Sequence, residues 1–159
     1  MTQLPSLGPR GEGWVVLQLV LLPLVAFAGI AGGGAWSGAL ASVTSLLGLA
    51  LMLGGVAMVG RGLLDLGHNL TPVPRPRGDA QLVETGVYAL VRHPIYGGII
   101  ATALGWGLVA ASPITMLLGG LLALFFDLKS RREEAWLVER YAGYRTYTGR
   151  TRRFFPRLY

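Results

Sequence analysis

Cysteine is absent from this chain of 159 residues, which excludes a disulfide framework and thiol chemistry. Charge is also scarce, because only 14% of the residues are charged whereas soluble domains usually carry about 25%. Lysine occurs once, at Lys129, beside thirteen arginines. This preference for arginine, with abundant glycine, alanine and leucine, is typical of a GC-rich bacterial genome. The composition therefore argues against an ordinary soluble domain.

The sequence contains two long stretches without charged residues. No Asp, Glu, Lys or Arg lies between Gly13 and Gly60, and none lies between His93 and Phe126. A helix needs roughly 20 apolar residues to cross a bilayer, so the sequence predicts an all-α, polytopic integral membrane protein with about four transmembrane helices. The first two are expected over Trp14–Ala35 and Ala39–Gly60. Glycines at 48, 54, 55 and 60 of the second predict close helix packing.

The last two helices must share a short stretch. Ile95–Phe126 breaks near Ser112–Pro113 and has only 32 residues, where two full crossings would want about 40. We therefore expect a tight C-terminal helical hairpin that begins near His93–Tyr96. Its second arm should leave the membrane at Asp127 and continue to Tyr141. The aromatic and basic tail that follows, residues 144–159, is expected to lie in the membrane interface on the cytoplasmic side.

The positive charges are distributed unevenly. The net charge is +6, and all fourteen basic residues fall at Arg10, in the segment Arg61–Arg92, or in the tail from Lys129. The positive-inside rule then places both termini and the central segment in the cytoplasm, which for a bacterial protein means the inner membrane. We expect contacts with the bilayer and its anionic lipids, and no nucleic-acid partner. The oligomeric state cannot be inferred from these features.

Polar side chains gather where the third apolar stretch begins. Gly86–Gly98 reads G-V-Y-A-L-V-R-H-P-I-Y-G-G, and two adjacent acids, Glu133 and Glu134, follow that stretch. Polar groups at a membrane boundary are costly unless they serve a purpose. Taken singly, Arg92 could mark the cytoplasmic edge and the acids could form a solvated helix face. Their order and spacing together favour a functional site.

These motifs resemble the isoprenylcysteine carboxyl methyltransferase and phospholipid methyltransferase superfamily, over roughly residues 60–159. The matching segments are Arg92-His93-Pro94-Ile95-Tyr96-Gly97-Gly98, the pair Glu133-Glu134, and the lead-in Leu82–Tyr88. The resemblance implies an S-adenosylmethionine-dependent methyltransferase whose donor binds on the cytoplasmic side. It implies one membrane domain, residues 1–159, with two spans in 1–60 and a methyltransferase core in 61–159. The donor-site residues that it implies are Val83, Gly86, Tyr88, Arg92, His93, Pro94, Tyr96, Gly97, Glu133 and Glu134.

The chemistry of the donor agrees with these residues. A glutamate can pair with its ammonium group, and Arg92 can grip its carboxylate with two parallel hydrogen bonds. Tyr88 and Tyr96 offer ring faces to the adenine or the sulfonium. Adjacent residues on a helix point about 100° apart, so one glutamate should face the pocket and the other an arginine or the cytoplasm. We favour Glu134 slightly as the inward acid.

The acceptor is expected to be a lipophilic small molecule or lipid that carries a carboxylate, an amine or a thiol. A carboxylate needs no deprotonation, whereas an amine or a thiol does, and His93 or His68 could then assist. Arg92 and His93 are the catalytic candidates, and His68, Asn69 and Arg153 are candidates for the acceptor side. No metal site is predicted. The alternative is a non-enzymatic membrane subunit or transporter component, in which these residues would serve topology and assembly.

Overall fold

The computed structural model describes residues 5–71, 73–76 and 78–158, and it is helical throughout apart from loops and one isolated bridge between Val91 and Arg152. Two short 3-10 turns, η1 and η2, lie between the second and third α-helices. The elements are α1 (Glu12–Ala31), α2 (Gly38–Leu66), η1 (Gly67–Asn69), η2 (Gly86–Ala89), α3 (Pro94–Val109), α4 (Pro113–Arg140) and α5 (Tyr144–Arg150). The all-α prediction is confirmed.

Three helices are long and apolar enough to cross a membrane, namely α1, the helical stretch Gly38–Asn69, and α4. α3 has 16 residues and, at 1.5 Å per residue, is about 24 Å long, somewhat less than the ~30 Å of a bilayer core. α3 and α4 form the expected hairpin, and α4 continues past Asp127 to Arg140 as predicted. The protein is therefore a polytopic membrane protein with a short third helix.

The second helix is longer than expected. We placed its end at Gly60, where the uncharged stretch stops, but α2 continues to Leu66. Arg61 and Asp65 stand one turn apart on this extension and form an ion pair of 3.0 Å, which supports another turn of helix outside the apolar region. The proline-rich connection beyond it is not helical at Thr71 or over residues 73–76, while Pro72 and Arg77 lie outside the described residues.

Glycines set the distance between α2 and α3. A Cβ added at Gly48 would lie 2.5 Å from the carbonyl oxygen of Gly105, and one added at Gly55 would lie 2.5 Å from that of Gly98. These two helices make the most extensive contact in the protein. The predicted packing role is thus confirmed for Gly48 and Gly55. It is wrong for the glycines at 54 and 60, which face open space.

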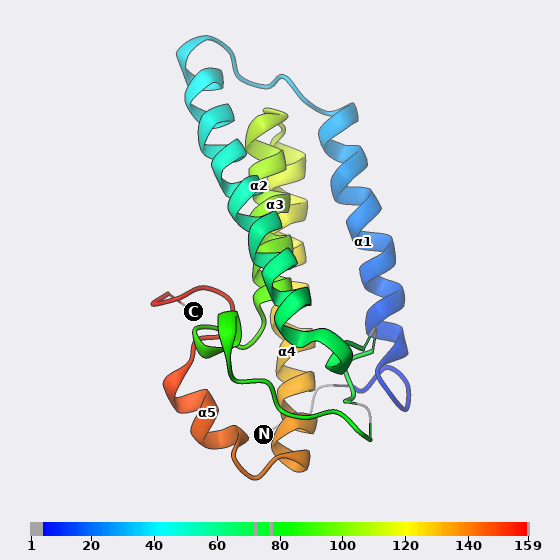
Figure 1. Ribbon diagram of the computed structural model, residues 1–159. Coiled ribbons are helices and arrows are strands. Elements are labelled where there is room, and N and C mark those ends of the chain that lie inside the picture. Colours follow the sequence, from blue (N-terminus) through cyan, green and yellow to red (C-terminus); the bar gives the residue numbers. More distant parts are fainter. Residues whose placement is uncertain (1–4, 72, 77, 159) are drawn as a thin grey trace.

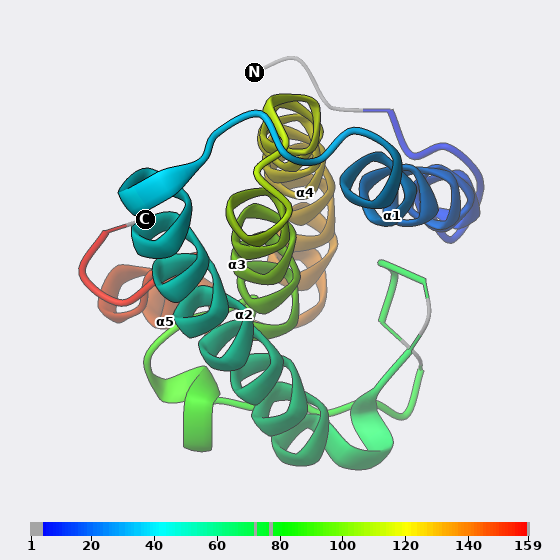
Figure 2. The ribbon, with the colours of Figure 1, turned by 90° about the horizontal axis from the view of Figure 1, so that it is seen from above.

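The helices form a bundle with its loops sorted to two ends (Figure 1). The start of α1, the long α2–α3 connection, α5 and the tail gather at one end. Seen from above, α1 stands beside α4 and apart from α2 (Figure 2).

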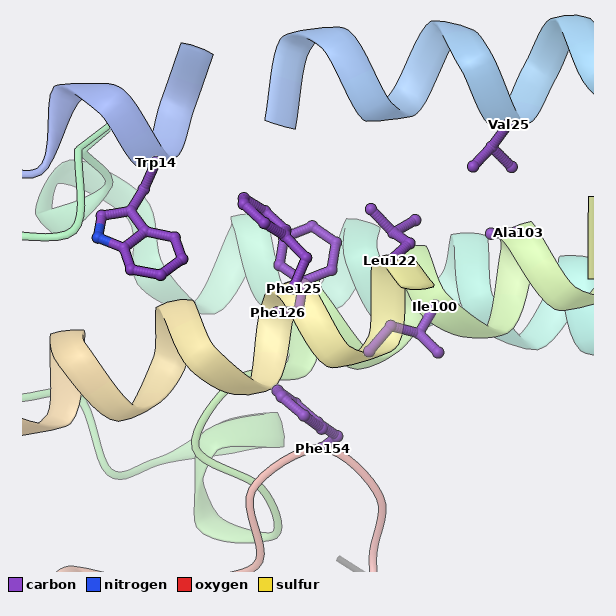
Figure 3. Close-up of a cluster of buried hydrophobic side chains, with 8 residues drawn as sticks. All are labelled: Trp14, Val25, Ile100, Ala103, Leu122, Phe125, Phe126 and Phe154. Atoms are coloured by element: carbon purple, nitrogen blue, oxygen red, sulfur yellow. The ribbon is translucent and has the colours of Figure 1, made fainter. Parts of the chain in front are cut away.

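A core of buried apolar side chains lies between α1, α3 and α4, and Phe154 from the tail closes it (Figure 3). Its members are Trp14, Val25, Ile100, Ala103, Leu122, Phe125, Phe126 and Phe154.

Candidate functional site

The tail holds the start of α3 in place. Arg92 and His93 lie directly before this helix, and Pro94 begins it, where a missing N–H costs no hydrogen bond. The backbone N–H of Arg92 donates to the carbonyl of Arg152 at 2.8 Å, and that of His93 donates to Arg153 at 2.9 Å. The C-terminal segment that was expected only to lie in the interface therefore packs against the motif itself.

Glu134 is the centre of an ion-pair network at this point. Its Oε1 lies 2.8 Å from Nε of Arg92 and 3.2 Å from Nε2 of His93, and its Oε2 lies 3.0 Å from an Nη atom of Arg153. The four side chains are between 5% and 16% exposed, so solvent screens them weakly. One carboxylate thus joins the start of α3, the C-terminal part of α4 and the tail.

Both arginines of this network have further partners. Arg92 also donates to the carbonyl oxygen of Thr151 at 2.6 Å. Arg153 also pairs with Asp127 at 2.7 Å, and Asp127 in turn pairs with Arg131, four residues along the helix, at 2.7 Å. Asp127 and Arg131 stand at the i, i+4 spacing at which such pairs form on a helix. Arg153, a candidate for the acceptor side, bridges two acids of α4.

Glu133 points the other way, toward α3. It accepts a hydrogen bond of 2.8 Å from the hydroxyl of Tyr96, whose ring is stacked on those of His93 and Phe126. Glu133 lines a pocket and Glu134 does not. The expected division between the two acids is confirmed, but our preference for Glu134 as the inward acid is wrong. The reason is that Glu134 is turned toward three basic side chains.

The pocket measures about 270 Å³ and opens at the end of the bundle where the loops gather. Of the predicted site residues, seven line it: Asn69, Val83, Tyr88, Arg92, His93, Tyr96 and Glu133. Six others lie outside its wall: His68, Gly86, Pro94, Gly97, Glu134 and Arg153. The structure therefore brings about half of the predicted residues to one cavity and leaves the others outside its wall, most of them in supporting positions.

The supporting residues have identifiable structural roles. Gly86 has a left-handed φ of +60°, and a side chain there would collide with the carboxylate of Asp65. That carboxylate accepts a hydrogen bond of 2.8 Å from the N–H of Val87 and so fixes the turn. Gly97 allows the carbonyl of Phe154 to approach α3, since an added Cβ would lie 2.7 Å from it. His68 is exposed on η1.

Several pocket residues escaped the sequence reasoning, among them Gln18, Lys129, Tyr141, Tyr144 and Tyr147. Two of them carried a signal. Gln18 is the one strongly polar side chain of the first apolar stretch, and Lys129 is the single lysine, four residues before Glu133. Tyr141 reaches the pocket from the end of α4, whereas Tyr144 and Tyr147 reach it because the tail folds back, which no local pattern indicates.

The tyrosines that surround the pocket are held as neutral phenols. Burial raises the pKa of Tyr88, Tyr144 and Tyr147 well above its ordinary value. The hydroxyl of Tyr147 donates to the carbonyl of Tyr88 at 2.6 Å, and that of Tyr88 donates to Gly62 at 3.3 Å. These groups therefore shape an aromatic wall and do not serve as bases. Within the described ranges, no three His, Cys, Asp or Glu side chains are grouped to hold a metal ion.

A model of the phospholipid methyltransferase family matches residues 43–143, which is more than half of the chain and extends from α2 to the end of α4. α1 and the tail lie outside this match. The chain is also similar to individual proteins. It is 30% identical, over 91% of its length, to the cobalt-zinc-cadmium resistance protein CzcN of Cupriavidus metallidurans, and covers 62% of that protein.

Two eukaryotic relatives match a shorter part. Protein-S-isoprenylcysteine O-methyltransferase of Saccharomyces cerevisiae is 34% identical over 46% of this chain and 32% of its own length. The protein of the same name from Schizosaccharomyces pombe is 43% identical over 38% of this chain and 26% of its own length. The chain thus spans less than two thirds of the curated relatives that it matches.

Proposed function

Because the chain belongs to the phospholipid methyltransferase family, we propose that it transfers a methyl group from S-adenosylmethionine to a lipophilic acceptor at the cytoplasmic face of the membrane. The observation that carries the proposal is the position of Glu133. Its carboxylate lies on the wall of an aromatic pocket, at the end of the bundle, within the part of the chain that the family model matches.

The residues of the pocket fit the donor. The Glu133 carboxylate is suited to its ammonium group, and Tyr88, Tyr96 and Tyr144 provide ring faces for adenine or the sulfonium. Leu63, one of the apolar side chains of the wall, suits the uncharged parts of the ligand. The donor, when bound, would supply a methyl group on a positively charged sulfur.

The chain's own task is alignment and exclusion of water. Tyr96 fixes the direction of the Glu133 carboxylate, so the acid is oriented before a ligand arrives. Arg92 and His93 stand at the pocket wall, held by Glu134 and by the tail, and are the proposed catalytic residues. An acceptor that is already a carboxylate needs no base, whereas for an amine or thiol the ring of His93 could take the proton.

The remaining site residues are proposed in supporting roles. Val83 and Asn69 line the pocket from the α2–α3 connection, and Gly86, Pro94 and Gly97 shape the backbone around it. The distribution of basic residues supports an orientation with both termini in the cytoplasm, and the similarity to a bacterial protein supports the inner membrane. We also propose that residues 1–159 act as one membrane domain, since Gln18 of α1 and Glu133 of α4 line the same pocket.

The alternative is a non-enzymatic membrane subunit. The relative CzcN supports this alternative, because its name describes a metal-resistance protein and not a methyltransferase. Incubating membranes that contain the protein with methyl-labelled donor, and extracting the lipids, separates the two. If the protein is a methyltransferase, we expect a labelled lipid-soluble product that is absent with the Glu133→Gln variant. The product should persist with Glu139→Gln, because Glu139 is an exposed acid of the same helix. A product equally abundant with and without the protein would contradict the proposal.

A further inference from the structure

One basic side chain in the pocket has no part in the network around Glu134. Lys129 is only 3% exposed and lines the pocket one helical turn before Glu133. Its ammonium group has three N–H donors, and among the described residues its one hydrogen-bond partner is Oε1 of Gln18, at 2.5 Å. It also stands over the ring of Tyr96, 5.0 Å from the centroid.

Gln18 comes from the helix that lies outside the family match. Beyond Glu12 in the first turn, it is the one strongly polar side chain of α1, and its neighbours Leu17, Leu19 and Val20 are exposed apolar residues of a membrane-spanning helix. A polar side chain at such a place is costly without a partner. The contact between Gln18 and Lys129 therefore joins a helix outside the family match to the pocket within it.

Gln18 and Lys129 lie on the side of the pocket that is nearer the apolar core. Lys129 lies on the bundle side of Glu133, with its ammonium 5.9 Å from the ring centroid of Phe126 in the apolar core. α1 packs on α4 and α3 and stands apart from α2 (Figure 2). Gln18 of α1 and Leu63 of α2 both line the pocket. Lys129 is thus one helical turn nearer than Glu133 to the apolar part of α4.

We propose that Lys129, oriented by Gln18, binds an anionic oxygen of the lipophilic acceptor and so selects for negatively charged amphiphiles. This inference rests on the proposed function, because it names the acceptor class of the same site. A buried cation with unused donors stabilises a carboxylate or phosphate oxygen through charge-assisted hydrogen bonds. A cationic headgroup at the same place would meet like charge and would be rejected. Lys129 is thus a specificity-determining residue.

The test compares three probes with the same alkyl chain and different heads: palmitate, hexadecylamine and hexadecanol. Binding is followed by the thermal unfolding of the purified protein in lipid nanodiscs, without donor. We expect palmitate to stabilise the wild type and the other two to do so far less. Lys129→Gln should raise the half-saturating palmitate concentration by about 10-fold or more, as the loss of a charge-assisted hydrogen bond predicts. Lys129→Arg should retain the preference.

The control is Arg145→Gln, which removes one positive charge from an exposed position of α5 and should bind palmitate as the wild type does. Equal binding of palmitate and hexadecylamine, or unchanged palmitate binding in a folded Lys129→Gln, would overturn the inference.

Donor affinity separates the remaining outcomes. Lys129→Gln should bind S-adenosylmethionine as the wild type does, and a tenfold loss with palmitate binding intact would assign the lysine to the donor instead. A wild type that binds no donor would contradict the proposed function, whatever the palmitate result.

Discussion

Glu134 should matter more for the stability of the folded site than for any ligand. Its carboxylate contacts Arg92, His93 and Arg153, all of them at most 16% exposed. Removing one partner of a buried ion pair typically costs about 3–5 kcal/mol. Arg92 retains the carbonyl of Thr151, and Arg153 retains an acid of α4, so we expect Glu134→Gln to cost somewhat less, about 2–3 kcal/mol.

Thermal unfolding followed by tryptophan fluorescence measures this cost. For a chain of this size, 1 kcal/mol corresponds to roughly 2–4 °C, so Tm should fall by about 4–12 °C. Glu139→Gln, on the exposed face of the same helix, should change stability by less than about 0.5 kcal/mol. A Glu134→Gln protein with the Tm of the wild type would refute the view that this acid fastens α3, α4 and the tail together.

Three further outcomes are expected. Tyr96→Phe should weaken donor binding about 3- to 10-fold, measured by titration calorimetry, because Glu133 loses the hydroxyl that orients it; equal affinity would show that the bond has no such role. Gly55→Val should lower stability by about 1–3 kcal/mol because it overpacks α2 on α3, whereas Gly54→Val, in open space, should be neutral, and equal Tm values would contradict the packing. Burial raises the pKa of Tyr144, so the stability that its neutral phenol contributes is fully present below the ordinary pKa of 10.0 and is lost as pH rises above it; a Tyr144→Phe protein should show a smaller loss of Tm at alkaline pH than the wild type.

The sequence was sufficient for the features that depend on local pattern. Uncharged stretches identified the helices, and the start of α3 was placed correctly near His93–Tyr96. The end of α2 was missed because an ion pair between Arg61 and Asp65 extends a helix beyond its apolar limit. A prediction based on apolar residues alone does not include the stabilisation of a helix by such an ion pair.

The errors at the site have a different origin. The choice between Glu133 and Glu134 depends on where Arg153 lies, and Arg153 reaches Glu134 because the tail returns along the start of α3. This contact joins segments far apart in the chain, so spacing on α4 could indicate that the two acids diverge but not which one faces the pocket. Lys129 was visible as the single lysine, but its partner on α1 was not.

The most direct test of the account is the affinity of the purified protein for S-adenosylmethionine, measured by titration calorimetry for the wild type, Glu133→Gln and Glu139→Gln. Loss of a charge-assisted bond of about 1.5–3 kcal/mol predicts roughly 10- to 100-fold weaker binding in Glu133→Gln. The Glu139→Gln control should bind as the wild type does. Equal affinity in all three proteins would contradict the assignment of Glu133 to the donor, and no binding by the folded wild type would contradict the proposed methyl transfer itself.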